Sequence, residues 1–413
     1  MSKYTIVGNG IAALMAAKAI AEHDYGSPIT IIAPRSMKTF SKPALRYLLE
    51  GKLRMQQIQR LPDDFYVQNN FHFINDMVSR VNPITKTLML SSNKTEKYAK
   101  LLLAYGAEGV APGSEGLDRE NVLSGYSFKD ILTMQRLIPK VSRAVVVGAG
   151  ATGLAMADAL SANGIHVTVV EKTNAILNNR IPLEHMNLIL GEYRKRGVLF
   201  ILNDEVKHCG GSGSQATYVE TEKGGRFETQ LVVFCCGMRT DVSLVAKTKI
   251  RRHNGIIVER DMSSTVENVW SAGTSAEFDD KVYNRYERYS EWQDCATMGR
   301  VAGLNMVGKK ALFRPGIPLF SAELAGQHFH MLGEQQVVDR RENGSVVERL
   351  DRGAGSFARL VFRDRILVGG SWYGASLNPF ILRKIIESES SLEQVGEHLL
   401  DPSFPWEHVL RLG

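Results

Sequence analysis

The chain has 413 residues, which is long for one domain, so we expect two or three. Hydrophobic residues make up 44% of it, enough for sizeable cores, and the formal net charge is +6. That charge fits an ordinary solvated surface or an acidic partner attracted over a long range. The basic clusters are short, scattered and free of interleaved aromatic residues, which disfavours nucleic acid as the partner.

The cysteines and the apolar runs narrow the class of protein further. The four cysteines form no C-x-x-C pair, so we expect no metal cluster held by the chain. Cys235 and Cys236 lie in the apolar run LVVFCC, which is typical of buried thiols. No run of 18 apolar residues occurs, so no membrane span is predicted. The N-terminus is predicted to be a strand rather than a signal peptide, which favours the cytoplasm.

The first predicted unit, residues 1–32, is a strand, a glycine turn, a helix and a second strand. Its turn has the sequence GNGIAA, in which Gly8 and Gly10 permit a tight bend and close approach of a pyrophosphate to the helix start. We therefore expect Gly8, Gly10 and Ala13 to hold a dinucleotide. The position after the second strand, where an acid would bind the adenosine ribose, is Ala33.

A second unit of the same kind runs from residue 144 to 172. Its turn, GAGATG, contains Gly148, Gly150 and Gly153, and its second strand ends at Glu171. A carboxylate at that place can accept hydrogen bonds from the ribose hydroxyls. Two such units in one chain predict two dinucleotides, and FAD with NAD is the usual pair in redox enzymes.

The same acid bears on the choice between NAD and NADP. The carboxylate of Glu171 would repel a 2′-phosphate, which favours NAD. The neighbouring Lys172 is a counter-argument, because a cation could attract that phosphate.

Further segments carry a family resemblance. They are FSKPAL at 40–45, AYGA at 104–107, LVVFCCGMRTDVSL at 231–244, ENVWSAGTSAEF at 267–278 and DCATMGRVAGLNMVG at 294–308. With them the chain resembles the FAD- and NAD(P)H-dependent pyridine nucleotide-disulfide oxidoreductases. It most resembles the branch of rubredoxin and ferredoxin reductases, NADH oxidases and the flavin module of nitrite reductase, over essentially its whole length.

This resemblance implies an α/β fold with two Rossmann-like domains, one for FAD and one for NAD, and a small C-terminal α+β domain. The boundaries expected are 1–110 and 238–314 for the FAD domain, 111–237 for the NAD domain and 315–413 for the C-terminal domain.

It also implies site residues. Lys42 should approach the flavin ring or its redox partner and is the expected catalytic residue. Further cofactor contacts are implied at Ala104, Gly106, Gly237, Gly273 and Thr274. No metal ligand is expected: His328 and His330 have the alternate spacing of a metal pair on a strand, but a packed pair is favoured because no third ligand is nearby.

Three departures from the family matter. Thr274 stands where the family has an aspartate, and Ala155 stands where it has a glutamate near the nicotinamide. The segment from Ser36 to Arg46 has no cysteine, which excludes thiol chemistry beside the flavin there.

The activity implied is transfer of electrons from NADH through FAD to a small acidic ferredoxin- or rubredoxin-type protein, or to a partner subunit with iron-sulfur centres. The alternative is a non-catalytic or scaffold relative with degenerate cofactor sites in a larger complex. A homodimer and a hetero-oligomer both stay open.

The segment VYNRYERYS places Tyr283, Tyr286 and Tyr289 at every third position, with Arg285 and Arg288 between them. As a helix it would align the tyrosines on one face. That face is either packed on the core or a basic, aromatic docking surface near the flavin for the acidic carrier.

Overall fold

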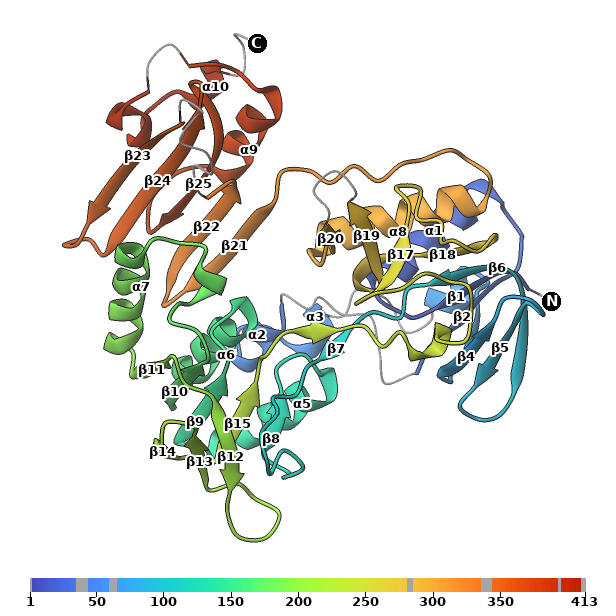
Figure 1. The fold of residues 1–413 in the computed structure, drawn as a ribbon, viewed down its shortest axis with the longest axis horizontal. Helices are drawn as coiled ribbons and strands as arrows, with labels where there is room; N and C mark the ends of the chain where they lie inside the picture. Colours follow the sequence, from blue (N-terminus) through green and yellow to red (C-terminus); the bar gives the residue numbers. More distant parts are fainter. Residues whose placement is uncertain are drawn as a thin grey trace. The chain divides into compact units, whose positions relative to one another are not determined.

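The computed structural model describes residues 2–34, 44–58, 65–280, 285–335, 344–392 and 395–409. The chain forms two compact units, each built from several segments (Figure 1). The first unit comprises Met1–Val110, Ser127–Lys129 and Gly237–Pro315. The second comprises Ala111–Tyr126, Asp130–Cys236 and Gly316–Gly413.

The first unit is built on a seven-stranded sheet in the order β3-β2-β1-β6-β5-β4, with β18 paired to β6. Its parallel strands are β1 (Ser2–Val7), β2 (Ile29–Ile32), β3 (His72–Ile74), β6 (Thr95–Leu103) and β18 (Val269–Ser271). An antiparallel hairpin of β4 (Val78–Asn82) and β5 (Thr87–Leu90) extends the sheet. The central strands are apolar runs because both of their faces are buried.

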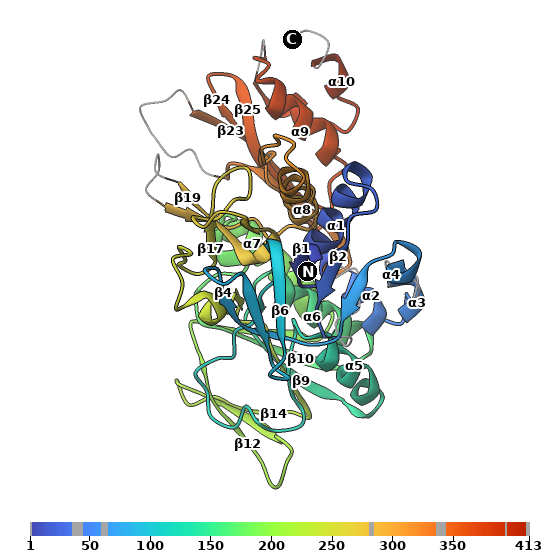
Figure 2. The same cartoon turned by 90° about the vertical axis from the view of Figure 1, so that its right-hand side faces the viewer.

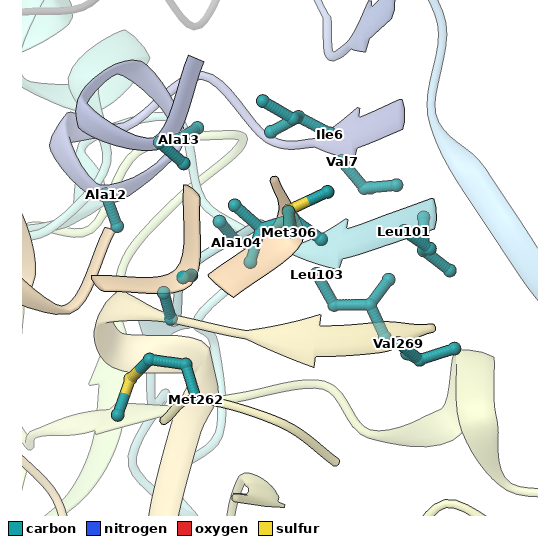
Figure 3. Close-up of a cluster of buried hydrophobic side chains, with 14 of the residues drawn as sticks. Ile6, Val7, Ala12, Ala13, Leu101, Leu103, Ala104, Met262, Val269 and Met306 are labelled. Carbon is teal, nitrogen blue, oxygen red and sulfur yellow. The ribbon is translucent and has the colours of Figure 1, made fainter. Parts of the chain in front are cut away.

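Two long helices of this unit, α1 (Ile11–His23) and α8 (Trp292–Met306), lie side by side in Figures 1 and 2. Their backbones touch because α8 presents glycines there: a Cβ at Gly299 or Gly303 would fall within 3.0 Å of the carbonyl oxygen of Ala12 or Ala16. Figure 3 shows Ala12 and Ala13 of α1 in one buried cluster with side chains of β1, β6 and β18.

Smaller elements complete the first unit. They are the helices α2 (Leu45–Leu49), α3 (Met55–Ile58) and α4 (Phe65–Gln68), the strand pair β7 (Glu108–Gly109) and β16 (Met238–Arg239), and a sheet of β17 (Ile256–Val258), β19 (Ala276–Asp280) and β20 (Arg285–Glu287). Short 3-10 helices cover Ser243–Val245 and Gly273–Ser275.

The helix predicted around Tyr286 is wrong. Residues Arg285–Glu287 form strand β20, which pairs antiparallel with β19 and sets Tyr286 opposite Asp279. The three-residue spacing of the tyrosines suggested a helix, but backbone pairing with the strand that precedes it decides the conformation. Tyr283 lies outside the described residues.

The second unit contains a five-stranded parallel sheet in the order β11-β10-β9-β15-β8. The strands are β8 (Val122–Ser124), β9 (Arg143–Val147), β10 (His166–Glu171), β11 (Val198–Leu202) and β15 (Leu231–Phe234). Its helices are α6 (Ala151–Ala162) and α7 (Leu183–Lys195), and α5 (Phe128–Leu137) leads into β9 through a 3-10 turn at Ile138–Lys140. Another 3-10 turn covers Leu177–Asn179, and β12 (Val206–Gly210), β13 (Tyr218–Thr221) and β14 (Arg226–Glu228) form a small antiparallel sheet.

The C-terminal part of the second unit is a five-stranded antiparallel sheet in the order β21-β22-β25-β24-β23. These strands are β21 (Leu319–Leu324), β22 (Gln327–Gly333), β23 (Gly344–Asp351), β24 (Ser356–Arg363) and β25 (Ile366–Tyr373). The helix α9 (Pro379–Ser388) packs on β22 and β25, and a 3-10 turn at Glu397–Leu400 and α10 (Trp406–Val409) follow (Figures 1 and 2). The predicted fold class, with two Rossmann-like sheets and a C-terminal α+β part, is confirmed.

Candidate functional site

The first glycine turn lies where β1 ends and α1 begins. Gly8 has a φ of +117°, and a Cβ there would meet the backbone of Ala104 at the end of β6 within 3.0 Å. Gly10, the residue that precedes α1, has no atom within 4 Å of the place where its Cβ would stand. No side chain caps α1, so the N–H groups of its first turn have no side-chain acceptor. Open space before uncapped N–H groups fits a dinucleotide pyrophosphate.

The second glycine turn repeats this geometry between β9 and α6. Gly148 has a φ of +101°, and a Cβ there would lie 2.7 Å from the carbonyl oxygen of Cys235. Gly150 faces open space and precedes α6, which also has no side-chain cap. Gly153 packs so closely on the turn that a Cβ would collide with the carbonyl oxygen of Gly148. These residues likewise fit a pyrophosphate.

The acid predicted to bind a ribose is joined to the second turn. One carboxylate oxygen of Glu171 accepts a hydrogen bond from the Ala149 N–H at 2.7 Å. The other accepts from the N–H and the hydroxyl of Thr173, both at 2.9 Å. The carboxylate is therefore held at the turn, in a fixed orientation. The neighbouring Lys172 pairs with Glu205 at 2.8 Å, and this hydrogen bond raises the lysine pKa.

The corresponding position of the first unit has no acid. Ala33 is buried, and its N–H donates to the carbonyl oxygen of Ile74. The side chain of Asn9, inside the first turn, instead accepts a hydrogen bond from the hydroxyl of Tyr66. The first turn thus offers backbone groups and neutral side chains, while the second adds a negative charge.

A corner of the first unit brings together several residues that the sequence implied. The N–H of Gly106 donates to the Ser275 hydroxyl at 2.7 Å, which joins the end of β6 to the turn after β18. The hydroxyl of Thr240 donates to the Thr274 carbonyl oxygen at 2.7 Å. Gly273 adopts a φ of +72° there. We call this set, from Ala104 to Gly106 and from Gly273 to Ser275, the β6–β18 corner.

The hydroxyls of Ser275 and Thr240 help to hold the β6–β18 corner together, and the sequence did not predict either of them. Both side chains are buried, and each makes its hydrogen bond to a residue far away along the chain. Neither stands out in the sequence, because short polar residues in loops are common and their long-range partners leave no local pattern.

The remaining predicted residues fall in different places. Ala13 is completely buried, which fits the packing role of the third position of the turn. Gly237 belongs to the first unit, where its carbonyl oxygen accepts a hydrogen bond from the Val110 N–H at 2.9 Å. Lys42 and the segment around it lie outside the described residues.

The histidine pair on β22 packs against its neighbours. The rings of His328 and His330 lie 6.3 Å apart, and His330 Nδ1 is 2.9 Å from the Ser321 hydroxyl. No three His, Cys, Asp or Glu side chains within the described ranges are arranged to hold a metal ion.

Cys209 and Cys235 are buried and are poor nucleophiles. Burial raises the pKa of the Cys209 thiol to about 11 and raises the pKa of Cys235 as well, and a thiol must ionise to attack. Cys236 is exposed, because strand β15 ends at Phe234 and this residue lies beyond it, so the prediction that both cysteines of LVVFCC are buried is wrong for Cys236. No described helix has the length and apolar character that crossing a membrane requires.

Comparison with known proteins identifies the family. The pattern of the family described as "Pyridine nucleotide-disulphide oxidoreductase" matches residues 2–299. The epsilon subunit of an NADH-dependent phenylglyoxylate dehydrogenase from Aromatoleum evansii is 27% identical over 368 residues, which cover 87% of this chain and 85% of that protein. A rubredoxin-NAD(+) reductase from Pseudomonas putida is 23% identical over 337 residues, covering 81% of this chain and 87% of the relative.

Solved structures show the same fold. The structure of a covalent putidaredoxin reductase–putidaredoxin complex aligns with a TM-score of 0.87 at 20% identity, over 100% of this chain and 98% of the matched one. The predicted family is confirmed, and FAD and NAD(P)H are the cofactors of that family. The chain belongs to the pyridine nucleotide-disulphide oxidoreductase family, as an NAD(P)H oxidoreductase that works with FAD.

Proposed function

We propose that the protein passes electrons from NADH through FAD to a small ferredoxin- or rubredoxin-type protein, or to a partner subunit with iron-sulfur centres. The observation that carries this proposal is the pair of glycine turns. Each follows the carboxyl end of a strand that pairs in parallel with both of its neighbours, and each leads into a helix without a side-chain cap. Only the second turn has an acid at the ribose position, which supports different ligands at the two sites.

We assign FAD to the first unit and the nicotinamide cofactor to the second. The proposed FAD contacts are Gly8, Gly10, Ala13, Ala104, Gly106, Gly273 and Thr274, with Lys42 at the flavin. The proposed NADH contacts are Gly148, Gly150, Gly153, Glu171 and Gly237. The corresponding domains are 1–110 with 238–314 for FAD, 111–237 for NAD and 315–413 at the C-terminus.

Backbone groups and side chains of this protein would bind and orient the cofactors. The chemistry that bound FAD would supply is hydride acceptance from NADH and onward electron transfer to the acceptor. The N–H groups at the starts of α1 and α6 would stabilise the pyrophosphate charge, and the Glu171 carboxylate would accept hydrogen bonds from ribose hydroxyls. The Thr274 hydroxyl can donate or accept a hydrogen bond where the family has a charged acceptor, so it holds its ligand more weakly.

The names of relatives support the class of acceptor. One relative is a reductase of rubredoxin, and one solved neighbour is a reductase joined to putidaredoxin. A third is a subunit of an NADH-dependent dehydrogenase, which supports the alternative of a partner subunit in a larger complex. The four cysteines are free thiols, in keeping with the reducing cytoplasm that we propose as the location.

Two linked measurements test the proposal. We expect the purified protein to show a flavin spectrum, or to acquire one when FAD is added, and to reduce a ferredoxin when NADH is supplied. A protein that binds no FAD under any condition would instead be the scaffold relative with degenerate sites. A flavoprotein that NADH reduces but that never reduces a protein carrier would contradict the proposed acceptor.

A further inference from the structure

The arginines predicted to form a docking face do not both serve that purpose. The guanidinium of Arg288 donates to the carbonyl oxygens of Asn254, at 3.1 Å, and Met238, at 3.2 Å. This side chain therefore fastens strand β16 to the loop before β17 and has a structural role. The loop that it fastens is itself strongly basic.

Five exposed cations gather on the segments that Arg288 joins. We call them the basic rim: Arg239, Lys247, Lys249, Arg251 and Arg252. Arg239 follows Met238 directly, and the other four lead to Asn254, so the two carbonyl contacts of Arg288 hold these segments together.

The charge of this rim is largely unneutralised. Arg251 pairs with Asp279 at 2.8 Å. The other four members form no ion pair with an acidic side chain in the part of the chain that the structure describes. Four unpaired charges on one short surface create a positive potential that attracts an acidic partner and speeds its encounter.

An aromatic pair lies beside these cations. The ring of His253 stacks on that of Tyr286 at 4.3 Å between centroids, and Tyr286 is 44% exposed. His253 follows Arg252 in the chain, so the pair adjoins the rim. A tyrosine that is partly open to solvent, surrounded by charged groups, is a common composition for the centre of a protein interface.

The rim also borders the β6–β18 corner. Arg239 precedes Thr240, whose hydroxyl holds the Thr274 carbonyl oxygen, and the Asp241 carbonyl accepts a hydrogen bond from the Tyr105 hydroxyl at 2.9 Å. Both contacts reach residues at or next to the proposed FAD site. A carrier bound to the rim would therefore stand close to the group that must reduce it.

We propose that the basic rim and the His253–Tyr286 pair form the docking surface for the acidic face of a small iron-sulfur electron carrier. This inference rests on the proposed function and specifies where on the first unit the acceptor binds. The favoured partner is a protein, since the rim adjoins a redox site.

Charge reversal tests the surface. The triple variant Lys247→Glu, Lys249→Glu and Arg252→Glu should reduce an acidic [2Fe–2S] ferredoxin at least about tenfold more slowly at low salt. The wild-type rate should fall as salt is raised, whereas the rate of the variant should stay level or rise, because salt then screens a repulsion instead of an attraction. Reduction of the bound flavin by NADH should be unchanged.

A matched control keeps the change in net charge equal. Lys18 on α1 and Lys309 and Lys310 after α8 are exposed cations of the same unit that lie outside the rim. Their reversal to Glu should slow ferredoxin reduction much less. If the charge-reversed variant fails to fold, the variant with Gln at the same three positions should also reduce ferredoxin more slowly than the wild type, by a smaller factor.

The outcomes separate the two proposals. Equal effects of the rim and control variants, or no effect of either, would overturn the docking surface. Tight duplex DNA binding lost in the rim variant, with ferredoxin reduction intact, would also overturn it. Failure of NADH to reduce the wild-type flavin would instead refute the proposed function.

Discussion

The two glycine turns have the same backbone design but differ in how closely the helix approaches. In the first unit the third position is Ala13, whose Cβ is accommodated in the core. In the second unit it is Gly153, where a Cβ would collide with the carbonyl oxygen of Gly148. The helix α6 therefore lies tighter against its turn than a side chain would allow, while α1 does not require a glycine at that point.

The turns also differ in charge and in what supports the helix. Glu171 places a carboxylate on the second turn, whereas Ala33 gives the first turn none. The first helix is supported instead by α8, through the close approach at Gly299 and Gly303. The same glycine turn is thus joined to a charged strand end in the second unit and to a neutral one in the first.

The largest effect is expected from making the second turn like the first. Gly153→Ala puts a Cβ against the carbonyl oxygen of Gly148 and should lower the free energy of unfolding of the second unit by about 3 kcal/mol. Gly150→Ala is the control, because its Cβ would meet no atom within 4 Å. The control should cost about 1 kcal/mol or less and weaken nucleotide binding. Equal unfolding curves for Gly153→Ala and the wild type would contradict the tighter packing of α6.

In the first unit, substitutions at the contact between α1 and α8 should reduce stability the most. Gly299→Ala would push α8 away from the Ala12 carbonyl oxygen and should lower the free energy of unfolding of the first unit by about 2 kcal/mol. The matched control is Gly10→Ala, which faces open space on the same unit. Denaturant unfolding followed by far-ultraviolet circular dichroism, which does not depend on flavin binding, measures both. An effect confined to Gly10→Ala would argue against α8 as the support of α1.

A smaller effect concerns the choice of nucleotide. Glu171→Gln keeps an oxygen that can accept the Ala149 N–H but removes the charge that repels a 2′-phosphate. We expect the preference for NADH over NADPH to narrow by about tenfold, or about 1.4 kcal/mol. Glu205→Gln, which releases Lys172 and leaves Glu171 charged, is the control. The measurement is the dissociation constant of each nucleotide. An unchanged ratio of the NADPH and NADH constants in Glu171→Gln would show that this carboxylate does not select between them.

The smallest expected effect is a difference between the two units in how their stability depends on pH. His185 of α7 is fully buried against Phe357, and burial lowers its pKa, with Glu348 opposing that shift. The described histidines of the first unit, His23, His72 and His253, are exposed.

The direction follows from the pKa. Because the folded-state pKa of His185 lies below its unfolded value of about 6.5, the unfolded chain takes up the proton first. The second unit should keep its stability above that pH and lose it as the pH falls through the folded-state pKa. Thermal unfolding from about pH 8 to pH 5 measures this, and His185→Gln should flatten the profile. A variant with the wild-type pH dependence would place the titrating group elsewhere.

The sequence predicted the local features well, because they depend on neighbouring residues. The glycine spacing and the apolar runs indicate both turns and their strands directly. What could not be predicted depends on contacts between distant segments. The Ser275 hydroxyl matters because the N–H of Gly106, far away in the sequence, donates a hydrogen bond to it. The internal role of Arg288 has the same origin, since its carbonyl partners lie far away in the sequence. Strand β20 is a nearer case: it forms by pairing with β19, the strand just before it, and the tyrosine spacing does not reveal that pairing.

The central claim is that the first turn holds FAD and the second holds NADH. The most direct test is a single-turnover experiment, in which FAD-loaded protein is mixed anaerobically with NADH or NADPH and the visible absorbance of the flavin is followed. We predict rapid loss of that absorbance with NADH and slower loss with NADPH. Bound flavin that stays oxidised with NADH, or that NADPH reduces faster, would contradict the account.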